Sequence, residues 1–253
     1  AHVVEVHRAH DQRVAPPCEH VAEGCGGCDL QHASMALQLE LKRQIVVESL
    51  VRLGRVTNPQ VRAIPSRSVG DRGRRTTVRV AAGPEGLGFR RRMSHDIVAI
   101  DSCLTAHPLV NRVVSELELR VGAEAMVRVS STTGEAVVWA EPPDDVIRHP
   151  SAVAVGPGAI VHEDVAGVRF QISAASFFQS SPSAAEELVD AVARALGPRE
   201  TWPLGSVVDA YGGVGLFAAT VVPRDLHVVL VEANAVAVAD ARVNLAGRSV
   251  EFE

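Results

Sequence analysis

The pattern of apolar and polar positions divides the chain into stretches of different character. Residues 2–10 alternate like a short strand and run into two consecutive prolines. Residues 34–54 repeat apolar positions at helical spacing, with Ser34 as the expected N-cap and Gly54 as the expected stop. Residues 60–165 carry short alternating runs separated by glycine and proline, which predict a compact antiparallel sheet.

The last stretch has the pattern of a parallel α/β sheet. Residues 181–197 predict a capped amphipathic helix. A strand, a glycine turn, a helix, a second strand and a second helix follow within residues 206–247. The expected fold class is therefore α/β: a Rossmann-like domain over residues 166–253, preceded by a small α+β domain over residues 17–165. With about two strands where such a domain has six or seven, the Rossmann-like sheet is expected to be incomplete.

Composition places the chain among globular proteins. Its 253 residues are 47% hydrophobic, which is enough for real cores. No run of 18 apolar residues occurs, and the first ten residues lack the features of a secretory signal. We therefore expect a cytoplasmic protein without membrane contact. Thiols stay reduced in that compartment, so four cysteines favour metal binding or catalysis over disulfides.

Charge is unevenly distributed along the sequence. The net charge is −5, yet nine arginines lie between Arg62 and Arg92 against only Asp71 and Glu85. A basic block in an acidic protein suggests local contact with a polyanion. Only one lysine accompanies 24 arginines. Arginine suits bidentate phosphate contacts, although a genomic codon bias gives the same imbalance.

Not every arginine of the block is expected to bind RNA. A solvated surface explains Arg62, Arg67, Arg72 and Arg74 equally well. The other five are the predicted RNA-binding residues, since one pair shares a face of a predicted strand and the other three follow a neighbouring strand. These five are Arg75, Arg79, Arg90, Arg91 and Arg92.

The cysteines are grouped unusually. Cys18, Cys25 and Cys28 fall within eleven positions, and Cys103 stands far downstream. Structural zinc usually takes two closely spaced ligand pairs, and only one such pair occurs here. Three thiolates from one loop and one remote thiolate suit a [4Fe-4S] cluster. Zinc and a set of unrelated cysteines are the alternatives.

A glycine turn follows the strand at residues 206–210. Gly213 and Gly215 allow the chain to turn tightly and bring backbone N–H groups beside a ligand. Glu232 ends the next strand, where its carboxylate can accept both ribose hydroxyls of an adenosine. With Ala218 the turn also satisfies G-x-G-x-x-A, so a nicotinamide or flavin dinucleotide stays open.

Five segments, taken in order, resemble a known enzyme family. They are "PPCEHVAEGCGGCDLQHAS", "LGFRRRMSHDIVAIDSCLTAHP", "SFFQSSP", "VVDAYGGVGLFAA" and "VEANAVAVADARVNLA". Together they span nearly the whole chain and resemble the S-adenosylmethionine-dependent RNA uracil-5-methyltransferases, specifically the iron-sulfur branch that acts on 23S rRNA. The resemblance implies methyl transfer from S-adenosylmethionine to C5 of a uridine in structured RNA, with rRNA favoured over tRNA. It implies no protein partner, so we expect a monomer.

The resemblance also implies particular site residues. It assigns a structural [4Fe-4S] cluster to the cysteines Cys18, Cys25, Cys28 and Cys103. It assigns the cofactor site to Gln179, Tyr211, Gly213, Gly215, Leu216 and Glu232. This sequence has Leu216 where the family commonly has a polar residue, and Gly212 where a cysteine is usual. Of the two phenylalanines in "SFFQ", one could pack against an extruded base, although both could equally be core residues.

The family's catalytic residues have no counterpart in this sequence. The chemistry needs a cysteine that adds to C6 of uracil and a base that removes the C5 proton. Both lie beyond the second cofactor strand in the family, and all four cysteines here already have another assignment. We therefore expect a fragment without the catalytic strands, in which residues 1–16 hold the last strand of an N-terminal RNA-binding barrel. A non-catalytic iron-sulfur RNA-binding protein and an iron-sulfur redox enzyme are the alternative functions.

Overall fold

The computed structural model describes residues 5–66, 70, 72–202 and 205–253. The chain divides into two compact units. Ala1–Arg67 and Phe89–Val98 form the first, called here the N-terminal unit, and Ser68–Gly88 and Ala99–Glu253 form the second, called the main unit.

The N-terminal unit contains the predicted helix. Helix α1 spans Met35–Arg52, and the Oγ of its N-cap Ser34 accepts a hydrogen bond from the backbone N of Leu37 at 3.2 Å. A 3-10 turn, η1, spans Glu19–Val21. Residues 5–10 form no strand, so the strand predicted over residues 2–10 is wrong for this part, and residues 1–4 lie outside the described residues. An alternating segment forms a stable strand only when a neighbouring strand pairs with it.

The main unit begins with the predicted antiparallel sheet. Six strands lie in the order β3-β2-β1-β5-β6-β8. β1 pairs antiparallel with β2 and with β5, β5 pairs antiparallel with β6, and β6 pairs parallel with β8. Val80, Val127 and Val137 are fully buried in it. The last two residues of β2, Phe89 and Arg90, and the first two of β3, Ile97 and Val98, belong to the N-terminal unit. The strands are β1 (Thr77–Gly83), β2 (Gly86–Arg90), β3 (Ile97–Ala99), β5 (Glu124–Val129), β6 (Ala136–Ala140) and β8 (Ala154–Val155).

Shorter elements surround this sheet. Helix α2 packs against β5, and β4 pairs with β7 in a separate two-stranded ladder. Their bounds are α2 (Pro108–Glu116), β4 (Glu118–Leu119), η2 (Pro143–Asp145) and β7 (Val146–Arg148).

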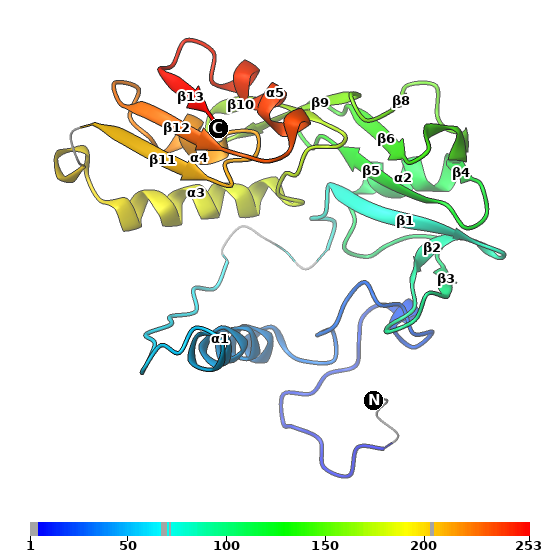
Figure 1. Ribbon diagram of the computed structural model, residues 1–253. Helices are drawn as coiled ribbons and strands as arrows, with labels where there is room; N and C mark the ends of the chain where they lie inside the picture. The colour runs from blue at the N-terminus through cyan, green and yellow to red at the C-terminus, as the bar shows by residue number, and fades with distance from the viewer. Residues whose placement is uncertain (1–4, 67–69, 71, 203–204) are drawn as a thin grey trace. The chain divides into compact units, whose positions relative to one another are not determined.

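A hairpin connects the antiparallel sheet to the parallel strands. β9 (Ile160–Val165) pairs with β10 (Val168–Ser173), and Val165 faces Val168 across the turn. It contacts β6 on one side and α4 and α5 on the other, so it lies between the two sheets (Figure 1). The division predicted between residues 165 and 166 therefore falls within the turn of one hairpin.

The parallel α/β segment follows the predicted order of elements. β11, β12 and β13 lie side by side in that order, and both pairings are parallel. The sequence pattern predicted two of these strands and missed β13, which is short and has a glutamate at its centre. The bounds are α3 (Pro182–Leu196), η3 (Arg199–Thr201), β11 (Ser206–Ala210), α4 (Leu216–Thr220), β12 (His227–Val231), α5 (Ala235–Asn244) and β13 (Val250–Phe252).

No helix in the described part of the chain is long and apolar enough to cross a membrane.

Candidate functional site

The glycine turn lies between β11 and α4. Gly213 and Gly215 have φ angles of 55° and 87°, which lie in the left-handed region that glycine adopts without steric strain. A Cβ on Gly215 would lie 3.0 Å from Cδ1 of Leu245, whereas one on Gly213 would meet open space. At position 215 both the packing against Leu245 and the backbone conformation therefore require glycine. At position 213 only the backbone conformation does, and the space beside the turn is open.

Glu232 connects this turn to the next one. Its Oε2 accepts a hydrogen bond from the backbone N of Gly213 at 3.0 Å, and its Oε1 accepts one from the backbone N of Asn234 at 2.8 Å. The Asn234 side chain in turn caps α5 by accepting from the backbone N of Val236 and of Ala237. An ionised carboxylate has about four acceptor positions, so Glu232 keeps capacity for further donors such as ribose hydroxyls.

Asp209 lies on β11 just before the turn. Its Oδ2 accepts a hydrogen bond from the backbone N of Ala218 at 3.1 Å, which joins the strand to α4. Burial raises the pKa of the Asp209 carboxyl, and the bond from Ala218 lowers it by less. An ionised Asp209 is therefore less stable here than in water.

The other predicted cofactor residues differ in their exposure. Tyr211 is 95% exposed and has a φ angle of 60°, which places its side chain outside the core. Leu216 is buried in the hydrophobic cluster beneath the turn, so only its backbone can face a ligand. A Cβ on Gly212 would lie 2.7 Å from Cγ of Leu230. This contact explains why glycine, and not the family's usual cysteine, fits at Gly212.

The segment that precedes α3 places its two phenylalanines differently. Phe178 is buried against Phe170, with ring centroids 5.9 Å apart, whereas Phe177 is 72% exposed. Of the two residues considered for contact with a base, Phe177 is the one whose ring is accessible. Gln179 is half-buried and follows directly.

The loop that carries three cysteines pairs with the end of β2. Cys25 and Arg91 form an antiparallel bridge, and the backbone N of Gly26 donates to the Arg90 carbonyl at 2.9 Å. A Cβ on Gly26 would lie 2.8 Å from that carbonyl oxygen, so the loop approaches the strand as closely as only glycine permits. The sulfur of Cys18 lies 3.6 Å from Nδ1 of His20.

Cys103 belongs to the main unit. Its sulfur lies 3.3 Å from Oγ1 of Thr105, and its backbone N and carbonyl both bond to the Asn111 side chain. The described residues include all four cysteines, and none of the four forms a disulfide. Over the same residues, no group of three or more His, Cys, Asp or Glu side chains is placed to hold a metal ion.

The predicted RNA-binding arginines fall into two groups. Arg90, Arg91 and Arg92 belong to the N-terminal unit, where the Arg91 side chain donates to the Glu23 carbonyl and the Arg92 side chain pairs with Asp29 at 3.2 Å. Arg79 lies on β1 of the main unit, exposed.

Arg75 is not in the predicted strand with Arg79. β1 begins at Thr77, and Arg75 instead forms a parallel bridge with Ala106, so the two do not share a strand face. Among the remaining arginines of the block, Arg67 lies outside the described residues, and Arg62, Arg72 and Arg74 are described.

Comparison with known proteins adds a second line of evidence. No protein-family model matches the chain. An RNA methyltransferase of Streptomyces avermitilis is 32% identical to it, in an alignment that covers 97% of this chain and 64% of that protein. A 23S rRNA (uracil(1939)-C(5))-methyltransferase of Chromohalobacter salexigens is 38% identical over 120 residues, 46% of this chain and 25% of that protein.

The chain is thus similar in sequence to proteins named RNA methyltransferases over nearly its whole length. It spans about two thirds or less of the length of the relatives named above. A solved structure shares its fold: the tRNA (uracil-54, C5)-methyltransferase of Pyrococcus abyssi, in complex with S-adenosyl-L-homocysteine, has a TM-score of 0.66 and 22% identity, and the match covers 98% of this chain and 67% of that one. The chain thus shares the mixed α/β fold of that structure.

Proposed function

We propose that this chain belongs to an enzyme that transfers a methyl group from S-adenosylmethionine to C5 of a uridine in RNA. The main support is the Glu232 carboxylate, which joins the Gly213 turn to the Asn234 turn at the ends of two adjacent parallel strands. Cofactors of this kind bind at the carboxyl ends of parallel strands, with an acidic residue on the ribose. The similarity to named RNA methyltransferases along nearly the whole chain supports the same reaction class.

The proposed cofactor site is formed by the residues that surround this turn. Gly213 and Gly215 would present backbone groups, Glu232 would accept the ribose hydroxyls, and the side chains of Tyr211 and Gln179 would contact the cofactor. Leu216 contributes its backbone alone, because its side chain is buried. When bound, S-adenosylmethionine supplies the electrophilic methyl group. The residues of this chain bind and orient it, and none of them is assigned as the nucleophile or base.

We propose 23S rRNA as the substrate. The Chromohalobacter relative, 38% identical over 120 residues, carries that specificity in its name. The alternative is tRNA, the substrate in the name of the structural neighbour, whose lower identity supports a common fold alone. In either case arginines of the basic block, namely Arg75, Arg79, Arg90, Arg91 and Arg92, would contact phosphates, and the exposed Phe177 ring would pack against an unstacked base.

We also propose that Cys18, Cys25, Cys28 and Cys103 hold a structural [4Fe-4S] cluster. Support comes from their spacing and from the tight pairing of the cysteine loop with Arg90 and Arg91. No step of the proposed reaction passes through the cluster.

Nucleoside analysis tests the reaction. RNA is isolated from cells with and without the gene that encodes this chain, separated into rRNA and tRNA, digested and analysed by mass spectrometry. The proposal predicts that 5-methyluridine falls in the rRNA of the deletion strain and returns with the gene. Loss from tRNA alone would identify the alternative substrate, and unchanged 5-methyluridine in both fractions would contradict the reaction.

A further inference from the structure

One side chain, that of Asn234, connects the turn after β12 to the segment that carries the exposed phenylalanine. Its Nδ2 donates a hydrogen bond to the carbonyl of Ala175 at 3.1 Å. Ala175 lies two residues before Phe177, whose ring is 72% exposed. The bond therefore ties the backbone next to Phe177 to the start of α5.

Asn234 also takes part in the hydrogen bonds around Glu232. Its backbone N donates to Oε1 of Glu232 at 2.8 Å, while Oε2 of Glu232 accepts from the backbone N of Gly213 at 3.0 Å. A continuous series of contacts thus runs from Gly213 through Glu232 and Asn234 to Ala175. It joins the proposed ribose-binding carboxylate to the segment proposed to contact an RNA base.

The same segment is also held by buried contacts that do not involve this turn. The guanidinium of Arg128 donates to the carbonyls of Ser173 and Ser176. The bond to the Ala175 carbonyl, in contrast, is exposed to solvent. A variant that loses only the exposed bond should therefore keep the fold. Its effect should be confined to the end of the segment that carries Phe177.

Helix capping uses only the acceptor of the Asn234 side chain. Its Oδ1 accepts from the backbone N of Val236 at 2.9 Å and from that of Ala237 at 3.3 Å. Serine and aspartate cap helices about as well as asparagine does. Of these three side chains, asparagine alone offers an amide N–H donor beside its acceptor. The donor that reaches Ala175 is thus a second function of the residue, separate from the cap.

We propose that Asn234 is a positioning residue that couples the cofactor site to the surface that contacts RNA, an inference that rests on the proposed function. Ribose hydroxyls that donate to Glu232 would make the Asn234 turn more rigid, and the Asn234 side chain would restrict Ala175 in turn. Less conformational entropy would then be lost when a base packs on Phe177. Cofactor and RNA should therefore strengthen each other's binding by the same factor.

Two substitutions separate the functions of this side chain. Asn234→Ser keeps an acceptor for the cap and loses the donor, so its melting temperature should stay near that of the natural chain. Asn234→Ala loses both and should melt at a lower temperature. The difference between the two variants measures the cap alone. Phe177→Ala, alone and combined with Asn234→Ser, tests whether Asn234 acts through the ring.

The measurement is the dissociation constant of a fluorescent uridine-containing RNA hairpin, with and without saturating S-adenosylhomocysteine. S-adenosylhomocysteine should strengthen RNA binding about fivefold in the natural chain and less than about twofold in Asn234→Ser. In the Phe177→Ala background, Asn234→Ser should have no further effect. Without RNA, the affinity of Asn234→Ser for S-adenosylhomocysteine should change by less than about twofold, because both N–H groups on Glu232 belong to the backbone.

Amide hydrogen exchange of the natural chain gives a second measurement, which needs no variant to fold. S-adenosylhomocysteine should slow the exchange of residues 176–179, and this protection should be absent in Asn234→Ser. Helix α1, in the N-terminal unit, is the internal reference and should exchange at the same rate throughout. Unchanged exchange of residues 176–179 in the natural chain would overturn the inference.

The outcomes distinguish this inference from the proposed function. If the natural chain fails to bind either S-adenosylhomocysteine or RNA, the proposed function fails and the inference fails with it. If it binds both, and Asn234→Ser couples them as strongly as the natural chain does, Asn234 is only a cap and the inference alone is overturned. An equal loss of RNA affinity from Asn234→Ser in the Phe177→Ala background would also overturn it, since Asn234 would then act through another group.

Discussion

Arg128 on β5 and Asp240 on α5 hold the same four-residue segment from two sides. The guanidinium of Arg128 donates to the carbonyls of Ser173 and Ser176, both at 2.7 Å. The carboxylate of Asp240 accepts from the backbone N and hydroxyl of Ser173 and from the hydroxyl of Ser176. Burial lowers the pKa of Arg128 to about 10, opposed by the charge of Asp240. Phe177 directly follows this segment, so the pair fixes the backbone from which the exposed Phe177 ring projects.

Asp240→Asn should destabilise the chain by about 3 kcal/mol. An amide has one acceptor oxygen, so its NH₂ group would face donors of Ser173 or Ser176, and Arg128 would lose a nearby buried negative charge. Urea unfolding measures the change. Asp190→Asn, on the exposed face of α3, is the control and should change stability by less than about 0.5 kcal/mol. Equal stability of the two variants would show that the segment is held by other contacts.

Asp209→Asn should stabilise the chain at neutral pH. Burial raises the pKa of Asp209 in the folded state. The contribution of this carboxyl to the free energy of unfolding is therefore fully present below its pKa in the unfolded state. It is lost as the pH rises through its pKa in the folded state. Asparagine keeps an acceptor for the backbone N of Ala218 and carries no charge. Melting temperatures should thus be higher for Asp209→Asn at pH 7 and should converge with those of the natural chain toward pH 3. A variant that melts lower at pH 7 would contradict this.

Gly215→Ala and Gly213→Ala should differ in their effect on stability. Both positions have positive φ, which costs a residue with a side chain about 1 kcal/mol or more. At Gly215 the new methyl group also meets the Leu245 side chain, so the loss should reach about 2 kcal/mol or more. Chemical denaturation of both variants tests the order. Greater destabilisation at Gly213 would mean that the turn packs differently.

The cluster proposal predicts iron and acid-labile sulfide in anaerobically purified protein, about four of each per chain for one cubane. Cys28→Ser should lose most of the iron and the associated visible absorption. Ser102→Ala, beside Cys103, is a control that leaves every thiol in place. Colourless, iron-free protein would contradict the proposal, and bound zinc in place of iron would identify the alternative metal.

The sequence predicted the elements whose signals are local. α1 begins after Ser34 because that serine caps it, and the turn between β11 and α4 is visible in the glycines that its positive φ angles require. The antiparallel sheet was also evident from alternation. β13 escaped prediction because three residues carry too little pattern, and its place depends on pairing with β12.

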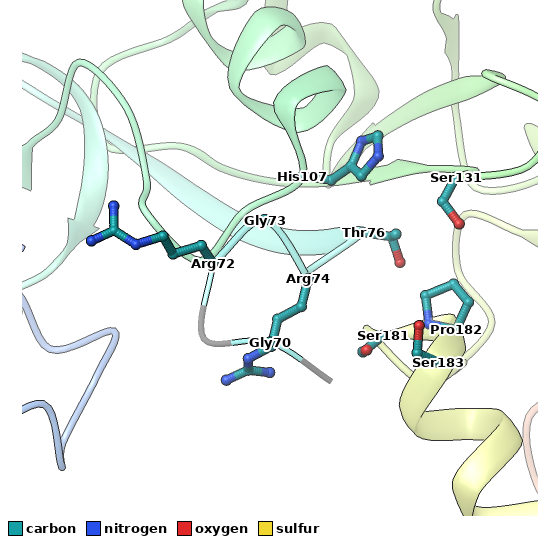
Figure 2. A pocket seen from close by; sticks show the side chains of 10 residues that line it. All are labelled: Gly70, Arg72, Gly73, Arg74, Thr76, His107, Ser131, Ser181, Pro182 and Ser183. Atoms are coloured by element: carbon teal, nitrogen blue, oxygen red, sulfur yellow. The ribbon is translucent and has the colours of Figure 1, made fainter. Parts of the chain in front are cut away.

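The site was predicted less completely, because its contacts join distant residues. Spacing identified Glu232, but the hydrogen bonds to the two turns follow from the parallel pairing of β11 and β12. The roles of Arg128 and Asp240 left no local signal, since nothing in the sequence around either residue shows which distant segment it contacts. The polar cavity lined by Thr76, His107, Ser131 and Ser183 (Figure 2) was missed for the same reason: segments far apart in sequence form its walls.

The most direct test of the account is calorimetric titration of S-adenosylhomocysteine into the 253-residue chain, its Glu232→Gln variant and its Glu251→Gln variant. Glu251 lies on β13 with an exposed side chain, so it controls for the loss of one carboxylate. An amide at Glu232 accepts from only one of the two backbone N–H groups and binds ribose hydroxyls less well. The account predicts binding that falls about tenfold or more in Glu232→Gln and stays unchanged in Glu251→Gln. Equal binding by Glu232→Gln and the natural chain, or no binding by any of the three, would contradict it.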